Sequence, residues 1–204
     1  MGSHYYYLVS QLPYLGFGQT PPMQSKAFKE LAKSLLTKKD AELLDLVDLD
    51  PQPPNPEDDG LSYAEKMPSS GSDFIDKWRE WERALRLNLA RHRANKLGRK
   101  EADSLDPPGF PAEAVDAAAR AVAVAGSPLE GENLLDRARW DAIESFQGSN
   151  YFSSNTVFAY MLKLFILERN ILFKTETGFS EYKALYASIL EGVQSGTSPA
   201  GEST

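Results

Sequence analysis

Residues 73–100 read DFIDKWREWERALRLNLARHRANKLGRK, the longest stretch of the chain that is typical of a single helix. Six large side chains recur along it at steps of 4, 3, 4, 3 and 4. They are Phe74, Trp78, Trp81, Leu85, Asn88 and His92. This spacing places them on one face of an α-helix, in a stripe like that of a coiled coil. We therefore expect a helix over 73–100 that extends roughly 40 Å at about 1.5 Å per residue.

Two shorter helices are predicted before this stretch. Residues 25–36 carry apolar side chains at spacings of three and four, including Phe28, Leu31 and Leu35. Thr37 precedes Asp40 by three positions, which indicates the start of a second helix, through Leu49. The segment from Tyr5 to Val9 has the aromatic composition of a strand, but the sequence offers no second strand. We expect it to be an extended arm packed on helices.

Four helices are predicted after the long one. An Ala-rich segment, 112–125, stops at Gly126, the residue type favoured just past a helix end. The next begins at Ser127-Pro128-Leu129-Glu130, which combines a Ser cap, Pro at the first helical position and Glu three residues after the cap. Residues 154–174 are apolar nearly all round, which predicts a central buried helix. A last helix is expected over 179–191, ending at Gly192.

Proline marks the joints between these segments. Of the 13 prolines, 12 lie at or before Pro128, and the 70 residues that follow contain none. We expect an N-terminal extended segment with two short helices (1–50), a Pro-rich linker (51–72), a helical bundle (73–192) and a disordered tail (193–204). The predicted fold class is all-α: an irregular helical bundle of one or two lobes with a short extended N-terminal segment.

The composition argues against most catalytic and metal chemistry. The 204 residues include no cysteine, two histidines, 29 acidic and 22 basic residues, for a net charge of −7. The lack of cysteine excludes disulfides, thiolate nucleophiles and cysteine-based zinc sites. Two histidines are too few for a histidine-rich metal site. We expect no enzyme activity and no cofactor. The most apolar run, Thr156 to Leu167, is about 12 residues, where a membrane-crossing helix needs about 20, so a soluble cytoplasmic chain is expected.

Several possible sites have structural interpretations that we favour. Gly16-Phe17-Gly18 lacks the third glycine of a phosphate loop and is interpreted as a turn. The pairs Arg137–Asp141 and Asp136–Arg139 are spaced for solvated intrahelical ion pairs. For His92 we expect a packing role. The remaining candidates, which are expected to form structural ion pairs or interface contacts, are Lys163, Glu168 and Arg169.

Charge is strongly segregated along the chain. From Arg83 to Lys100 there are seven basic residues and no acid, a run that we call the basic ridge. From Asp40 to Asp59 there are eight acids and no base. These blocks are either solvated faces that attract each other within the molecule, or a docking surface for an acidic partner. Nucleic-acid binding is the weakest interpretation, because no aromatic-studded basic sheet or groove accompanies the ridge.

Four pieces of the sequence carry a resemblance to a known family. They are Tyr5-Tyr6-Tyr7-Leu8-Val9 with Leu12-Pro13 and Pro21-Pro22; Trp78-x-x-Trp81-Glu82-Arg83-Ala84-Leu85-Arg86; Pro128-Leu129-Glu130 leading to Leu134-Leu135-Asp136-Arg137-Ala138-Arg139-Trp140; and Tyr160-Met161-Leu162-Lys163-Leu164-Phe165-Ile166-Leu167-Glu168-Arg169. Over residues 5–190 the chain resembles a bacterial domain family of unknown function that is encoded among V/A-type rotary ATPase subunit genes. The C-terminal half is also similar to the helical C subunit (d in eukaryotes) that joins the rotating central stalk to the membrane ring.

This resemblance implies a non-catalytic accessory or C-like central-stalk subunit that serves ion transport by docking helices and charge. Its partners would be other V/A-type ATPase subunits, and it would be peripheral to the inner membrane face through them. The expected partner-binding residues are Arg83, Arg86, Arg91, Arg93, Tyr5, Tyr6 and Tyr7. The alternative is a free-standing helical adaptor for an acidic protein. A third class, a hydrolase or transferase, would need a polar pocket around Lys163, Glu168 or Asp136.

Overall fold

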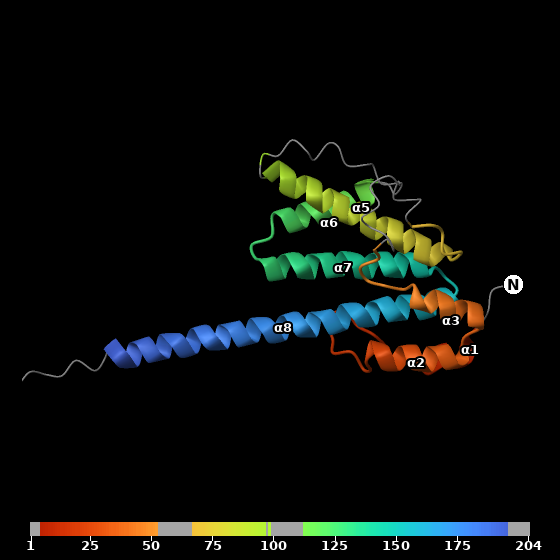
Figure 1. Cartoon of the computed structure of the whole chain (residues 1–204), viewed down its shortest axis with the longest axis horizontal. Helices are drawn as coiled ribbons and strands as arrows, with labels where there is room; N and C mark the ends of the chain where they lie inside the picture. The colour runs from red at the N-terminus through yellow and green to blue at the C-terminus, as the bar shows by residue number, and fades with distance from the viewer. Residues whose placement is uncertain (1–4, 53–66, 97, 99–111, 196–204) are drawn as a thin grey trace, which may run out of the picture. The chain divides into compact units, whose positions relative to one another are not determined.

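The chain was analysed as a computed structural model, which describes residues 5–52, 67–96, 98 and 112–195, without the side chains of 112–114, 174 and 176–195. It divides into two compact units, Met1–Glu168 and Arg169–Thr204. All regular structure in the described residues is helical, which confirms the all-α class (Figure 1). The helices are α1 (Tyr6–Ser10), α2 (Ser25–Leu35), α3 (Lys38–Asp45), α5 (Asp73–Lys96), α6 (Ala112–Ala123), α7 (Pro128–Gln147) and α8 (Ser154–Ser195).

The predicted stripe of the long helix is the face that α5 buries. Phe74, Trp78, Trp81 and Leu85 are all buried, and α5 contacts both α6 and α7. The Trp78 indole stacks on Trp81 at a centroid distance of 5.6 Å. Because a buried indole N–H needs an acceptor, Trp78 Nε1 donates to the Asp48 carbonyl at 2.7 Å. This bond holds the chain after α3 against α5.

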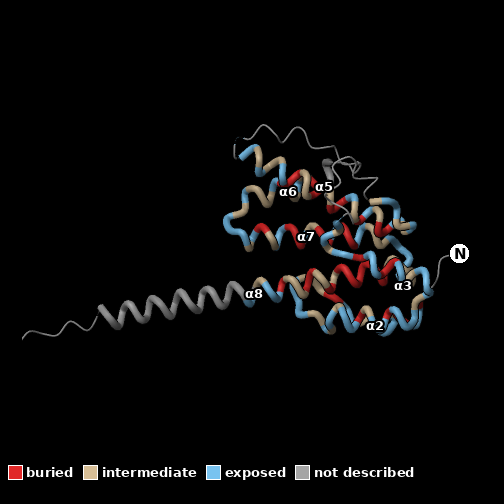
Figure 2. The backbone as a smooth tube through the Cα atoms, in the orientation of Figure 1, coloured by how far each residue is buried: buried red, intermediate tan, exposed pale blue. Residues whose placement is uncertain are grey.

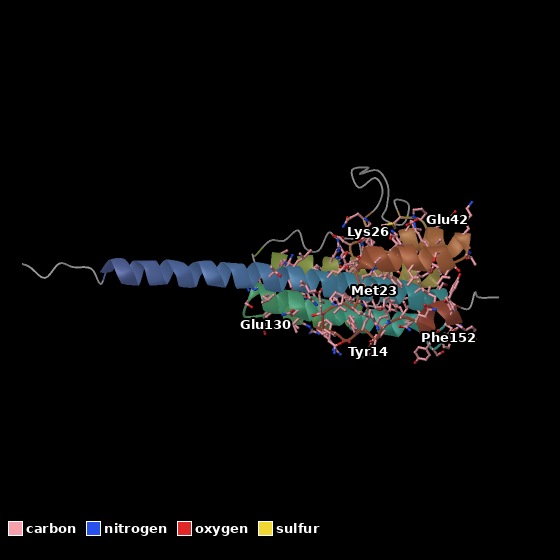
Figure 3. All side chains as sticks on the ribbon, turned by 90° about the horizontal axis from the view of Figure 1, so that it is seen from below. Tyr14, Met23, Lys26, Glu42, Glu130 and Phe152 are labelled. Carbon is pink, nitrogen blue, oxygen red and sulfur yellow. The ribbon has the colours of Figure 1, made fainter. Side chains whose placement is uncertain are left out.

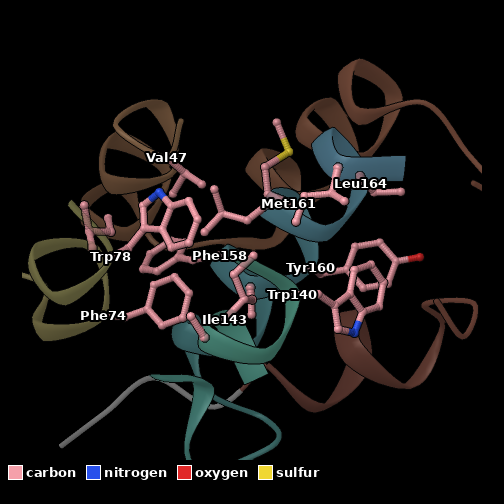
Figure 4. Packing of buried hydrophobic residues seen from close by; sticks show 14 of the residues in the cluster. Val47, Phe74, Trp78, Trp140, Ile143, Phe158, Tyr160, Met161 and Leu164 are labelled. Atoms are coloured by element: carbon pink, nitrogen blue, oxygen red, sulfur yellow. The ribbon is translucent and has the colours of Figure 1, made fainter. Parts of the chain in front are cut away.

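The core of the first unit gathers around the beginning of α8. From Val157 to Leu167 nearly every side chain of α8 is buried, as the apolar composition predicts (Figure 2). Phe158 packs against Phe74 of α5 at 6.2 Å, and Tyr160 packs against Phe28 of α2 at 4.7 Å. Figure 4 shows Phe74, Phe158 and Tyr160 with Trp140 and Ile143 of α7. Each fully buried large apolar side chain contributes roughly 1.5–3 kcal/mol, so this cluster is the main source of cohesion.

Both predicted helix caps are present. Thr37 accepts from the Asp40 amide at 3.2 Å at the start of α3. At the start of α7 the Ser127 hydroxyl accepts from the Glu130 amide at 3.2 Å, and Glu130 accepts from the Gly126 amide at 2.8 Å. These bonds satisfy amides that have no partner inside the helix and fix where each helix begins.

The expectation of an extended N-terminal segment is wrong. Tyr6–Ser10 forms α1, closed by the Val9 amide donating to the Tyr5 carbonyl at 2.9 Å. A single extended segment would leave its backbone groups without a strand partner, whereas a helical turn satisfies them internally. The turn buries Leu8, and the Tyr5 amide donates to the Phe152 carbonyl at 2.6 Å. Aromatic composition alone therefore led to the wrong expectation of an extended backbone.

The predicted break between helices 154–174 and 179–191 is also wrong. Ser154–Ser195 is one continuous helix, α8, which passes through Gly178 and Gly192. A glycine inside a helix costs only about 1 kcal/mol relative to alanine, which the neighbouring turns can offset. Most of the predicted Pro-rich linker (53–66), the end of the predicted long helix (97, 99 and 100) and the tail beyond Ser195 lie outside the described residues.

The cap of α7 gives a direct stability test. We expect Ser127→Ala to lower the free energy of unfolding by about 1 kcal/mol, because the Glu130 amide loses its acceptor. Urea denaturation followed by far-ultraviolet circular dichroism measures this change. Ser145→Ala, at an exposed position inside the same helix, is the matched control and should shift the value by less than about 0.5 kcal/mol. Equal effects of the two variants would show that the cap does not stabilise α7.

Candidate functional site

Three charged side chains are buried between α5 and α7, and we call them the buried ion-pair cluster. They are Glu82, Asp136 and Arg139, with 1%, 0% and 6% of their surfaces exposed. Arg139 Nη2 and Nε donate to the two carboxylate oxygens of Glu82 at 2.8 and 3.1 Å. Its Nη1 donates to Asp136 Oδ1 at 3.1 Å. The planar guanidinium thus forms a bidentate ion pair with Glu82 of α5 and a hydrogen bond to Asp136, one turn earlier in α7.

This geometry keeps Arg139 charged despite its burial. Burial works to lower the pKa of Arg139, but the hydrogen bonds and charges of Glu82 and Asp136 outweigh it, so the pKa of Arg139 is raised. Removing one partner from such a group leaves a buried charge uncompensated, at a cost of about 3–5 kcal/mol. The cluster therefore fixes the register of α5 on α7 more strictly than apolar contacts alone would.

The cluster corrects one sequence interpretation and confirms another. The Arg137–Asp141 pair is solvent-exposed, with a 3.1 Å separation, as predicted. The Asp136–Arg139 pair exists but is buried, because the two side chains face α5 rather than solvent. Glu82, its third member, was not identified as a candidate. The available signal was its spacing, four residues after Trp78 and three before Leu85, which puts a carboxylate inside the apolar stripe.

A chain of charges connects the cluster with the surface. Arg86 Nε donates to Glu82 Oε1 at 3.1 Å, and its Nη2 forms an ion pair with Asp50. Asp50 belongs to the acidic block and Arg86 to the basic ridge. The two blocks therefore attract each other within the molecule at this point, as the structural interpretation proposed. Arg86, with about a third of its side chain exposed, is largely committed to these internal partners.

The other ridge arginines differ in exposure. Arg83 and Arg91 are half-buried and have interactions within the chain. Arg93 and Lys96 are exposed, and neither forms an ion pair with any residue that the structure describes. We call this pair the ridge end. It is the part of the ridge whose charge no described carboxylate neutralises.

The three N-terminal tyrosines also have different environments. Tyr5 is a core residue, 8% exposed, and its hydroxyl donates to the Asp40 carboxylate at the start of α3. Tyr6 and Tyr7 are 58% and 70% exposed. The Tyr6 ring packs on Phe152, which is labelled in Figure 3, at a centroid distance of 4.5 Å. Tyr6, Tyr7 and Phe152 form what we call the aromatic patch, and Tyr5 contributes to its support rather than to its surface.

Lys163 and Glu168 of α8 have structural partners. Lys163 Nζ lies 3.0 Å from Glu144 Oε1 and 4.9 Å from the centre of the Trp140 ring. Glu168 accepts from the amide and hydroxyl of Ser25, at 2.6 and 2.7 Å, and so caps α2. A cavity of about 210 Å³ is lined by Lys163 and Glu144 but not by Asp136 or Glu168. The three residues considered for a hydrolase or transferase are therefore not brought together in it.

In the second unit, the guanidinium of Arg169 lies 5.4 Å from the centre of the Phe173 ring, one turn further along α8. This arrangement is a cation–π contact within the helix. Arg169 also has interactions beyond this one. It is therefore engaged within the chain, as the interpretation of a structural residue expected.

His92 forms a pair with α6. Its Nε2 lies 2.9 Å from Asp116 Oδ1, and Arg120 Nη2 lies 3.1 Å from the other oxygen of the same carboxylate. This contact joins α5 to α6 near a cavity that His92 lines. Among the described residues, no group of three or more His, Cys, Asp or Glu side chains is arranged to hold a metal ion. The described residues also contain no helix long and apolar enough to span a membrane.

Comparison with known proteins gives one similarity. Residues 122–193, about a third of the chain, match a family model described as "Protein of unknown function (DUF2764)". The matched region includes α7, the caps at its start and α8 as far as Val193. No curated protein and no solved structure matches the chain. The match confirms the similarity to a family of unknown function over this region, and its description names neither an activity nor a partner.

Replacing Arg139 should show how much the fold depends on the cluster. We expect Arg139→Met to lower the free energy of unfolding by about 3–5 kcal/mol, because two carboxylates stay buried without their cation. The control, Arg137→Met, removes an exposed cation two residues away and should cost less than about 1 kcal/mol. Chemical denaturation of both variants measures the difference. Similar losses in the two variants would contradict the assigned role of the cluster.

An apolar replacement of the whole cluster separates charge burial from packing. The triple variant Glu82→Met, Asp136→Leu, Arg139→Met should recover most of the stability that Arg139→Met loses, because no buried charge remains. If the triple variant is no more stable than the single one, the loss arises from packing instead. This measurement also covers the case in which Arg139→Met alone does not fold.

Glu144 predicts a pH dependence. Burial works to raise the pKa of Glu144, but hydrogen bonds from Lys163 and Trp140 and the charges of Lys163 and Arg137 outweigh it, so its pKa is lowered. A carboxyl whose folded pKa lies below its unfolded value stabilises the fold above the unfolded pKa, and this stability is lost as pH falls through the folded pKa. Glu144→Gln should therefore lower the melting temperature at pH 7 but hardly at pH 2.5. Glu30→Gln, on the exposed face of α2, is the matched control.

Proposed function

We propose that this chain is a non-catalytic accessory or C-like central-stalk subunit of a bacterial V/A-type rotary ATPase. In this role it docks onto another subunit by helix packing and charge, while the other subunits carry out the chemistry. The resemblance over residues 5–190 supports the identity of the complex. The family match over residues 122–193 is consistent with it but adds no functional description.

The docking proposal rests mainly on one observation: some cations of α5 are paired within the molecule, whereas others are exposed. Arg86 is neutralised inside the molecule by Glu82 and Asp50. The ridge end, Arg93 and Lys96, is exposed and has no ion pair with a described residue. Exposed charges of one sign raise the association rate and select partners of the opposite sign. An acidic surface on the partner is therefore the natural complement of the ridge end.

The buried ion-pair cluster supports a mechanical role for the same helix. Since Arg139 of α7 pairs with both carboxylate oxygens of Glu82 on α5, α5 is presented to a partner in one fixed position. A surface that is already ordered loses less conformational entropy on binding. Such a surface is also suited to transmitting force, since displacing α5 along α7 would break buried charge pairs.

The aromatic patch is the second proposed contact. Tyr6 and Tyr7 expose more than half of their surfaces, and the Tyr6 ring packs on Phe152. A cavity of about 190 Å³ is lined by Tyr5, Tyr6, Tyr7, Leu8 and Leu35. Tyrosine is enriched at protein interfaces because it offers a large rigid ring with a polar end. We therefore retain Tyr6 and Tyr7 as contact residues and assign Tyr5 to the support of α1.

A pull-down from the native bacterium tests this proposal. The tagged chain should recover V/A-type ATPase subunits, and Arg93→Glu with Lys96→Glu should reduce the recovery several-fold by reversing the charge of the ridge end. Lys26→Glu with Lys38→Glu makes the same charge change at exposed positions in or next to α2 and α3 and should leave recovery unchanged. Tyr7→Ser should also weaken recovery without changing the melting temperature, because the ring is 70% exposed.

Two results would contradict the proposal in different ways. Normal ATPase assembly and coupling after deletion of the gene would exclude a role in the complex. Recovery of an acidic protein unrelated to the ATPase, sensitive to the same charge reversal, would instead support the free-standing adaptor. In both cases the double variants must first be shown to melt at the temperature of the unaltered protein.

A further inference from the structure

A cavity of about 370 Å³ lies beside the ridge end, where α5, α6 and the start of α7 meet. Its apolar wall is formed mainly by Leu89 of α5, Ala119 and Val122 of α6, and Pro128 of α7. Its volume is at the lower end of the range for sites that bind small organic groups, about 300–1,000 Å³. The cavity is therefore large enough for an apolar side chain together with part of the backbone that carries it.

The polar side chains that line this cavity include two cations and one carboxylate. Arg93 and Lys96 line it as exposed side chains, while Glu132 contributes a carboxylate from α7. Glu132 has interactions within the chain. His92 also lines the cavity, and its ring is held by Asp116 at 2.9 Å. An apolar wall beside two exposed cations fits a group that is apolar at one end and anionic at the other.

Gly131 keeps part of the cavity open. It lies in the first turns of α7, is buried, and lines the cavity. A Cβ at this position would lie 3.5 Å from Val122 Cγ1 and 3.8 Å from Ala125 Cβ, which are ordinary packing distances. Neither contact requires glycine, although glycine destabilises a helix relative to alanine. The missing side chain leaves room in the cavity instead of relieving a clash.

We infer that this cavity receives an apolar side chain of the partner protein, with an adjacent carboxylate of the partner paired to Arg93 and Lys96. This inference rests on the proposed docking function and specifies the chemistry of the partner: a segment in which a leucine-sized residue is next to Asp or Glu. The apolar group supplies most of the affinity through burial. The carboxylate, which meets exposed cations, contributes less and sets the orientation.

The absence of cysteine from the chain allows a direct test by disulfide trapping. Ala123→Cys places a single thiol in the cavity lining, and Val124→Cys places one at a neighbouring position that is 82% exposed and outside the lining. Each variant is equilibrated with four peptides of the form Ac-Cys-Gly-X-Z-Z-NH2, each supplied as its mixed disulfide with 2-mercaptoethanol, in the presence of free 2-mercaptoethanol. The protein thiolate attacks the peptide sulfur of that disulfide and releases 2-mercaptoethanol, so that capture is a reversible exchange. X is Leu or Ser and Z is Glu or Gln, and mass spectrometry measures the fraction captured.

At Ala123→Cys, we expect Leu peptides to be captured about tenfold more than Ser peptides, and Glu peptides about two- to fivefold more than Gln peptides. The Glu preference should disappear when Arg93→Gln and Lys96→Gln are added. The Leu preference should disappear with Gly131→Leu, whose side chain fills the cavity. At Val124→Cys, all four peptides should be captured nearly equally.

Equal capture of the four peptides at Ala123→Cys would overturn the inference, and so would a Leu preference that survives Gly131→Leu. Each variant is first compared with its parent by thermal melting, so that unfolded protein is not scored as a loss of binding. The outcome is independent of the ATPase pull-down. Selective capture without ATPase recovery would preserve the partner chemistry and reject the proposed complex, whereas the reverse result would reject only the cavity.

Discussion

The pairing of Arg139 with Glu82 and Asp136 is the constraint on which the first unit depends most. Apolar packing between α5 and α7 tolerates small shifts, since one buried surface can replace another at little cost. The guanidinium of Arg139, which donates to the two carboxylate oxygens of Glu82 at 2.8 and 3.1 Å, does not, because a slip of α5 along α7 separates these buried charges. The apolar contacts supply cohesion, and the cluster selects one alignment.

Other features of the first unit follow from that alignment. Once α5 is fixed on α7, Trp78 can reach the Asp48 carbonyl, and Arg86 can bridge Glu82 and Asp50. These bonds draw the segment after α3 onto the long helix, although about thirty residues separate them in the sequence. The acidic and basic blocks thus meet where Arg86 pairs with Asp50, and among the described residues of the basic ridge Arg93 and Lys96 remain exposed at the far end of α5.

The sequence predicted the helices well where the local signals were strong. The stripe from Phe74 to Leu85 and the caps at Thr37 and Ser127 depend on spacings of three or four residues. Such patterns can be recognised in the sequence without knowledge of the tertiary structure. The N-terminal helix was missed because the aromatic composition of Tyr5 to Val9 favours an extended backbone. Gly192 was given too much weight as the end of the last helix, since α8 continues through it to Ser195.

The candidate site was harder to predict, because its members are distant in the sequence. Asp136 and Arg139 have the spacing of a solvated surface pair, and nothing within α7 shows that Glu82 covers them from α5. In the same way, the seven basic residues between Arg83 and Lys100 do not show by their positions in the sequence which of them form ion pairs with acidic residues in the folded protein. Among the described residues, Arg86 is paired and Arg93 is not because Asp50 lies next to Arg86, and this position of Asp50 is known only from the tertiary structure.

The exposed charges of the ridge end and the buried ion-pair cluster also differ in how strongly their interactions depend on ionic strength. At physiological salt the Debye length is about 8 Å, so exposed cations such as Arg93 and Lys96 are screened, while a buried pair such as Arg139–Glu82 is screened much less. Moderate salt could therefore release a partner from this protein while its helices stay in register. Attachment would respond to the ionic conditions of the cell, and the internal alignment of the helices would not.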